Sequence, residues 1–453
     1  MSQHPLAVLR KSLGLSQSQY ARLVDKAHSA MGFGYLVSHR VKMSRWESGR
    51  TTPDLHAQFS IARIHHVAES EVVRLGWPQW LHLATGDAML VNRPWTARGA
   101  IDAFNDAVTL AGSPSHSHLA LTGSRVQGFA EMLQCASSTS PVKPETDGRK
   151  DVDDAAVAGF YASIRNLERV RWAVSPQALY PAALGNLTTI TAFLTENGYR
   201  DETGVRLLRL ASRTGILCGV LSLSLDCNIQ AERFSLAAIR AAIVIGSPEL
   251  ALYNLVILAY SHLAAGAARD VFPLLESVQD GIRWRHSSRI VVAMYLLSAL
   301  AHAELGESAA SSRDLERASK SLAVLQDSQN CPAVDRSCKI DEKWILAASE
   351  VSRIRLGQSQ PALERLALLL SDTGAAATQF FPAATHELLE VVDTQLKIGK
   401  IQSAAHTVQW ALAPFGKPPA EIKRKYRKKL EPYHSHPAVK EILDLWDSEG
   451  SAV

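Results

Sequence analysis

Two stretches near the N-terminus guide the interpretation of this chain: LRKSLGLSQSQYARLV at residues 9–24 and SHRVKMSRWESGRTTPDL at residues 38–55. In the first stretch, Ser16 is placed to cap the N-terminus of a helix. Gln19, three residues later, is placed to complete a capping box. Apolar residues follow at the three- and four-residue spacing of a helix with one buried face. The first stretch therefore predicts a helix from Ser16 to about Val24.

The second stretch predicts a helix over residues 38–46, which Gly49 then terminates. Val41 and Trp46 fall at helical spacing with Met43, so we expect these three side chains to form the buried side of the helix. Pro53 and Asp54, which follow this helix, are expected to begin a third helix. The basic side chains are expected to point away from the buried side; they are His39, Arg40, Lys42 and Arg45.

The basic residues are concentrated in two segments. Residues 1–50 carry eight Arg or Lys against Asp25 and Glu47, and residues 417–430 carry seven against Glu421. Each segment has a net charge of +6, whereas the whole chain has only +4, so the rest of the sequence sums to −8. Two basic segments around an acidic middle indicate a polyanion partner for one of them or for both.

The remainder of the sequence predicts an all-α fold. Strand patterns are scarce, and Ala- and Leu-rich segments with helical periodicity recur from about residue 155 onward. A polar stretch with two prolines, at residues 135–154, indicates a linker between two parts of the chain. The predicted organisation is an N-terminal domain at 1–75, a Trp-rich helical connector at 76–134, the linker at 135–154 and a repeat domain at 155–453.

The repeat domain is predicted from a loose pattern of helix, glycine and second helix. The glycines of this pattern are Gly266, Gly306, Gly357 and Gly399. Similar two-helix units are predicted at 176–214, 215–245, 249–282, 344–371 and 384–413. Stacked units of this kind would form an α-solenoid similar to a tetratricopeptide (TPR) array. The alternative is an irregular helical domain without a groove.

The N-terminal residues resemble the Cro/cI-type helix-turn-helix of the Xre family. The match lies at Leu-Ser-Gln (15–17), at SRWESGR (44–50) and at Pro53, and the resemblance covers residues 3–75. It implies a DNA-binding domain whose second predicted helix enters the major groove of double-stranded DNA, where Arg or Lys can address guanine. The resemblance places Gln17 near a phosphate and Ser38, His39, Arg40, Lys42, Ser44, Arg45 and Arg50 at the DNA, whereas Trp46 and Glu47 pack and end the helix.

One departure from the family pattern separates the two predicted helices. A helix-turn-helix joins its helices by a turn of roughly 3–4 residues, but here residues 25–37 intervene. Gly32 and Gly34 predict a loop, and the residues before them are expected to extend the preceding helix. The insertion is either a passive excursion, which we favour, or a further contact to the DNA backbone.

The connector holds Trp77, Trp80 and Trp95. These tryptophans could form an aromatic site for a ligand or a nucleobase. We instead expect a helical cap that packs the N-terminal domain against the C-terminal part of the chain.

The basic segment at 417–430 predicts an amphipathic helix. Ile422, Tyr426 and Leu430 follow one another at four-residue intervals, with basic residues between them. The charges either face solvent or form a second patch for phosphate groups. The residues of this second patch would be Lys423, Arg424, Arg427 and Lys428.

Neither an enzyme nor a metal site nor a cofactor site is indicated by the motifs. The chain contains no GxxxxGK[ST], no HExxH and no GxSxG pattern. Five cysteines without CxxC spacing predict a reduced, cytoplasmic protein. The N-terminus lacks a leader pattern and the longest apolar runs are about 12 residues, so we expect no membrane span.

The whole arrangement resembles long bacterial Xre-type regulators with a helical-repeat C-terminal half. This resemblance implies a sequence-specific transcriptional regulator that binds a double-stranded DNA operator. It also implies a homodimer formed through the repeat domain, which would sense a peptide or a small-molecule signal. The alternative is an interaction protein whose helical array sequesters a peptide or protein, with only weak, non-specific DNA binding.

Overall fold

The computed structural model is all-helical in the part of the chain that it describes, and that part holds no β-strand. The all-α prediction is therefore confirmed. Ser38, His39 and residues 138–152 of the predicted linker lie outside the described residues. The described residues are 4–450 except 37–39, 79, 82–83, 85–89, 112–118, 138–152, 172–173, 226, 280–288, 327–339, 358–360, 363–364, 367–390, 394 and 413–419.

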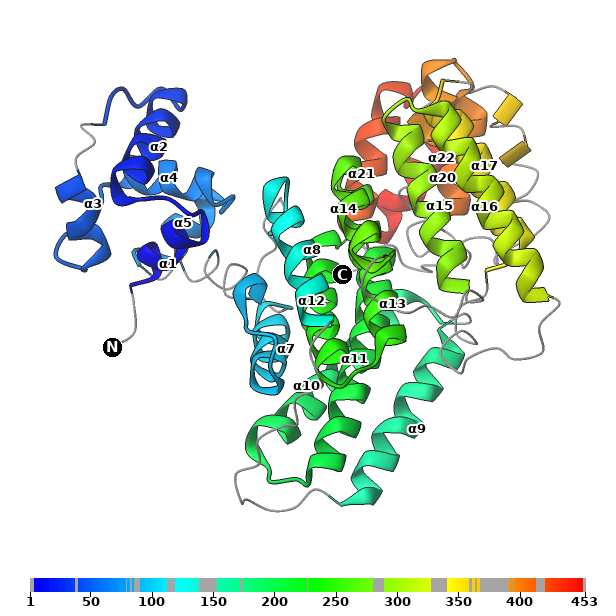
Figure 1. The fold of residues 1–453 in the computed structure, drawn as a ribbon. Coiled ribbons are helices and arrows are strands. Elements are labelled where there is room, and N and C mark those ends of the chain that lie inside the picture. Colours follow the sequence, from blue (N-terminus) through cyan, green and yellow to red (C-terminus); the bar gives the residue numbers. More distant parts are fainter. Residues whose placement is uncertain are drawn as a thin grey trace.

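Five short helices form the N-terminal part, drawn in blue in Figure 1. They are α1 (Pro5–Ser12), α2 (Gln17–Ala30), α3 (Arg40–Glu47), α4 (Leu55–Ile64) and α5 (Glu69–Leu75). α2 packs against α3 and α4, while α1 contacts α3 and α5 contacts α4. Tyr20, Met43 and Trp46 are the largest buried side chains that α2 and α3 contribute to their common core.

The predicted starts of α2 and α4 are confirmed. The Ser16 hydroxyl accepts the backbone N–H of Gln19, and the Gln19 side chain accepts the backbone N–H of Ser16. Asp54 caps α4 in the same manner. α2 continues past Val24 to Ala30, as expected for the first residues of the insertion, because no helix-breaking residue occurs until the glycine two positions beyond its end.

The tryptophans of the connector belong to two separate hydrophobic cores. Trp80 and Ala84 are buried in the core of the first five helices, and Trp77 packs against it. A second core begins at Leu90 in the sequence, and Trp95 packs against that one. The first core thus continues past the predicted boundary at residue 75.

The second core is built from the remaining helices, coloured from cyan to red in Figure 1. They are α7 (Ala97–Ala111), α8 (Ser124–Ser137), α9 (Asp154–Val170), α10 (Pro176–Glu196), α11 (Asp201–Ser224), α12 (Asn228–Val244), α13 (Pro248–Ala264), α14 (Ala268–Gln279), α15 (Arg289–Glu304), α16 (Ser308–Gln326), α17 (Glu342–Arg355), α20 (Ile401–Leu412), α21 (Ala420–Leu430), the 3-10 turn η4 (Glu431–Tyr433) and α22 (Pro437–Gly450). Successive helices from α10 to α17 pack against each other. The helices α11, α13, α15 and α17 also contact one another in a row.

The glycines predicted to end helices do so. Gly266, Gly306, Gly357 and Gly399 all have positive φ angles, between 76° and 83°, a backbone conformation that only glycine adopts without strain.

The predicted division between units 176–214 and 215–245 is wrong, because it falls inside the continuous helix α11. Gly215 and Gly219 of α11 serve close packing. A Cβ atom at Gly215 would lie 2.7 Å from the Cβ of Ala238 on α12, and one at Gly219 would lie 2.9 Å from Ile257 Cγ2 on α13. The two glycines thus let α12 and α13 approach α11 more closely than a larger residue would allow.

α7 and α8 are packed onto the repeat helices: α7 contacts α10 and α12, and α8 contacts α14. Two buried charged side chains of α12, Arg240 and Glu232, form hydrogen bonds with main-chain groups of the segments that pack beside this helix. Arg240, fully buried, donates from Nε to the carbonyl of Arg93 at 3.0 Å and also donates to the carbonyl of Val91. Burial lowers the pKa of Arg240 to about 10. Glu232, also fully buried, accepts the backbone N–H groups of Ala120 and Leu121 at 2.7 and 2.9 Å.

α11 is the one helix in the described part of the chain that is long and apolar enough to span a membrane by length and composition. In this fold 72% of its most apolar window is buried among the other helices. Core helices pass the same test, so it is weak evidence for a membrane span.

Candidate nucleic-acid interface

A buried ion pair holds the end of α3 against α1 and α2. Arg10 of α1 donates from Nε to Glu47 Oε1 at 2.5 Å and from Nη2 to Oε2 at 3.2 Å. The third guanidinium nitrogen donates to the carbonyl of Leu15 at 2.6 Å, and Gln17 Nε2 donates to Glu47 Oε2 at 2.8 Å. We call Arg10, Glu47 and Gln17 the Glu47 junction; it joins the first turn of α2 to the last turn of α3.

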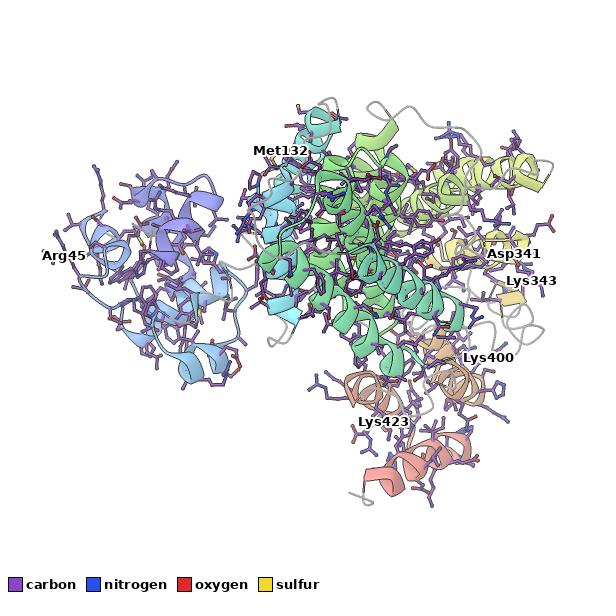
Figure 2. All side chains as sticks on the ribbon, turned by 90° about the horizontal axis from the view of Figure 1, so that it is seen from below. Arg45, Met132, Asp341, Lys343, Lys400 and Lys423 are labelled. Carbon is purple, nitrogen blue, oxygen red and sulfur yellow. The ribbon has the colours of Figure 1, made fainter. Side chains whose placement is uncertain are left out.

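The Glu47 junction determines which side of α3 faces solvent. The Arg10 and Glu47 side chains are only 11% and 7% exposed, and Met43 and Trp46 are buried beside them. The opposite side carries Arg40, Val41, Ser44 and Arg45, all of which are exposed; we call these four residues the α3 outer face. Figure 2 shows Arg45 at the outer edge of the N-terminal part, pointing away from the remaining helices.

Val41 is not in the core, contrary to the prediction, and is 60% exposed. Each helical residue turns by about 100°, so Val41 lies about 200° from Met43. Met43 and Trp46, three residues apart, share the buried side and leave Val41 on the same side as Arg45, one turn later.

The other described residues that were predicted to contact DNA, Lys42, Arg50 and Gln17, differ in the exposure of their side chains. The Lys42 ammonium lies 5.5 Å from the centre of the Trp46 ring, and the side chain is half-buried. Arg50 is exposed, just beyond the end of α3. The Gln17 side chain is half-buried, and its amide is engaged by Glu47.

The insertion between α2 and α3 is held by specific contacts as far as Leu36. The Gly34 carbonyl lies 2.9 Å from His28 Nδ1 and accepts the Ser29 hydroxyl at 3.1 Å. The backbone N–H of Leu36 donates to Asp25 Oδ1 at 2.8 Å. The first part of the insertion extends α2, as expected.

An aromatic contact secures the same loop against α4. The ring of Phe33 stacks on His56 with centroids 4.3 Å apart and an interplanar angle of 15°. Tyr35, between the held residues Gly34 and Leu36, is 91% exposed. The loop is therefore anchored while one aromatic side chain extends into solvent.

A second polar contact lies beneath α2, where the Tyr20 hydroxyl is 2.7 Å from Nε2 of His65. Burial and the nearby Glu47 carboxylate raise the pKa of Tyr20 above its usual range. Burial, as the largest cause, lowers the pKa of His65 to about 3 together with the positive charge of Arg125 on α8 and the neighbouring His66. His65 is therefore neutral in the folded protein at pH 7.

The basic segment forms α21 and buries Tyr426 and Leu430, as predicted. The side chain of Ile422, the third residue of that stripe, and Lys417 lie outside the described residues. Figure 2 places Lys423 on the C-terminal part, away from Arg45.

The basic side chains of α21 are partly neutralised. Arg427 forms an ion pair with Asp447 of α22. The Lys423 ammonium lies 6.0 Å from the centre of the Trp446 ring. Arg424 and Lys428 are exposed.

Among the described residues, no group of three or more His, Cys, Asp or Glu side chains is arranged to hold a metal ion. An open pocket lies between α16 and α17, lined by Ser319, Leu322, Ala323, Glu342, Ile345 and Leu346.

Comparisons of the chain with protein-family models, with curated proteins and with solved structures found no match.

Replacing Glu47 by alanine should strongly destabilise the N-terminal part. The change leaves the Arg10 guanidinium buried without its carboxylate, which costs about 3–5 kcal/mol. Hydrogen exchange of α2 and α3 peptides along a urea gradient would measure the loss. Glu71→Ala is the matched control, because its partner Arg74 is exposed, and it should cost less than about 1 kcal/mol. Equal losses in the two variants would contradict a structural role for the junction.

The stability of the N-terminal part should fall as the pH drops below about 6.5. The unfolded chain binds a proton at His65 near pH 6.5 and the folded chain only near pH 3. Acid therefore favours unfolding, by at most about 1.4 kcal/mol per pH unit in this window. The same exchange measurement between pH 6.5 and 5 should give a smaller slope for His65→Gln. An unchanged slope would show that other groups cause the pH dependence.

Proposed function

We propose that this chain is a sequence-specific DNA-binding transcriptional regulator of the Cro/cI helix-turn-helix type. Its first five helices would form the DNA-binding domain, and the helices of the second core would form a TPR-like α-solenoid. The proposed role is binding and not catalysis, and it would be carried out in the cytoplasm.

The observation that carries this proposal is the cationic α3 outer face. Arg40 and Arg45 are exposed on it, Arg50 follows directly, and the Glu47 junction holds the opposite side. A short exposed helix with arginines is the element that a helix-turn-helix places in the major groove. Bidentate contacts from arginine to guanine would provide the sequence specificity.

The remaining predicted contacts would position the domain on the phosphate backbone. Gln17, at the first turn of α2, would donate to a phosphate by exchanging its contact with Glu47. Lys42 and Ser44 would supply further contacts beside the arginines, together with Ser38 and His39. Phosphate contacts of this kind fix the register without reading the sequence.

A homodimer would combine two such domains on one operator. A single module has a modest interface with DNA, so two linked modules gain affinity and define the spacing between half-sites. We propose that the repeat domain joins the protomers and receives a peptide or small-molecule signal. Such a signal can act only if it binds two dimer geometries with unequal affinity.

The decisive experiment is selection of fragmented genomic DNA on the purified full-length chain at near-physiological salt, followed by sequencing. Retention of a small set of fragments with a shared symmetric motif is the expected result. Diffuse recovery, with dissociation constants of about 10⁻⁴–10⁻⁶ M for all fragments, would refute the regulator. That outcome would favour the alternative, an interaction protein with weak DNA binding.

Arg40→Ala and Arg45→Ala should each weaken binding to a selected operator by about 5- to 150-fold, the equivalent of about 1–3 kcal/mol. Helix content should not change, because both side chains are exposed. Fluorescence anisotropy would measure the affinity. Arg63→Ala, an exposed arginine of α4, is the control and should bind as wild type. Wild-type affinity in both α3 variants would exclude the α3 outer face from the groove.

The second patch on α21 should affect the salt dependence of DNA binding if it contacts phosphate. Replacing Arg424 and Lys428 by glutamine should reduce the slope of log K against log salt concentration by about 1 for each lost contact. The control exchanges two exposed arginines of α9 and α11, Arg165 and Arg209. Identical slopes in the two double variants would mean that the α21 charges face only solvent.

A further inference from the structure

One residue of the α3 outer face is unlike its neighbours. Val41 is 60% exposed and lies one helical turn before Arg45, with the guanidinium group of Arg40 next to it in the sequence. The core side of α3 is filled by Met43 and Trp46, so packing within the chain does not require an apolar residue at position 41.

Helix stability does not explain this valine either. β-Branched residues lose side-chain freedom in a helix and rank below alanine, lysine or arginine in helix propensity. α3 has only eight residues, so each position has a large share in its stability. An exposed apolar branched side chain among arginines is instead suited to contact a partner that is both anionic and locally apolar.

The major groove of DNA offers such a surface. Its edges present hydrogen-bonding groups and a single kind of apolar group, the 5-methyl of thymine. Arginine is suited to guanine, and an apolar side chain is suited to contact that methyl group. The Lys42 ammonium lies over the Trp46 ring, which leaves the α3 outer face with two guanidinium groups, one hydroxyl and the valine.

We propose that Val41 is a specificity determinant that contacts the 5-methyl group of a thymine in each operator half-site. This inference rests on the proposed function and deepens it. Val41 and Arg45 are four residues apart, about 6 Å along the helix axis at 1.5 Å per residue. Successive bases of one strand are about 3.4 Å apart. The thymine contacted by Val41 therefore lies within about two base pairs of the guanine contacted by Arg45.

Replacing thymidine by deoxyuridine in the operator tests the proposed Val41 contact directly, because the exchange removes the methyl group of the base and leaves its hydrogen-bonding groups intact. Each thymine of an operator recovered in the genomic selection is exchanged in turn, and the full-length chain is titrated against each duplex. We expect one position per half-site at which the wild-type chain binds about fourfold more weakly, the equivalent of about 0.8 kcal/mol for one buried carbon group.

The variant Val41→Ala identifies the side chain responsible. It should bind the thymine and uracil duplexes almost equally, and its helix content should be retained because alanine favours helix. Val73→Ala is the matched control: this valine is 64% exposed on α5 of the same N-terminal part. It should discriminate between thymine and uracil as the wild type does.

The possible failures are distinguishable. If the wild-type chain binds every uracil duplex as well as the thymine duplex, or if Val41→Ala keeps the full discrimination, the Val41 inference is overturned while the regulator stands. If the selection recovers no preferred sequence, the proposed function fails and the inference fails with it.

Discussion

The organisation of the N-terminal part depends on the buried ion pair between Arg10 and Glu47. Two charges at this depth are tolerated because each guanidinium nitrogen and each carboxylate oxygen has a hydrogen-bond partner, among them the Leu15 carbonyl and the Gln17 amide. The pair ties α3 to α1 and α2 at one end, and Trp46 anchors it from below. A helix of only eight residues needs such external support, because its own hydrogen bonds barely offset the cost of nucleation.

Buried charged side chains with hydrogen-bond partners also connect α12 to the segment that follows the first core in the sequence. Arg240 and Glu232 are buried charges whose partners are main-chain groups near residues 91–93 and 120–121. These contacts attach the segment to the repeat helices. Ala84 of the first core and Leu90 of the second are six positions apart, which limits their separation to about 20 Å. The proposed DNA-binding domain is thus tethered closely to the proposed sensing domain.

Local signals of the sequence predicted the helices of the site but not their packing. The Ser16 capping box, the Asp54 cap and the glycines that end helices depend on neighbouring residues alone, and the structure confirms them. The prediction that Val41 is buried is wrong because Val41 is two residues from Met43, a spacing of about 200° that places the two side chains on different sides of α3. The pairing of Arg10 with Glu47 spans 37 positions, and no local pattern in one sequence indicates it.

The sequence by itself determined that this protein is helical, where α2 and α4 begin, which glycines end four of its helices, and that its positive charge is concentrated at residues 1–50 and 417–430. Periodicity, capping and charge are properties of short segments, so one sequence suffices to read them. Only the tertiary structure decided which basic residues remain exposed, that α12 buries charges against the connector, and that the valine of α3 faces solvent. Each of these outcomes depends on which distant segment packs against a given helix face, and a buried partner can neutralise, orient or cover a side chain irrespective of its neighbours in the sequence.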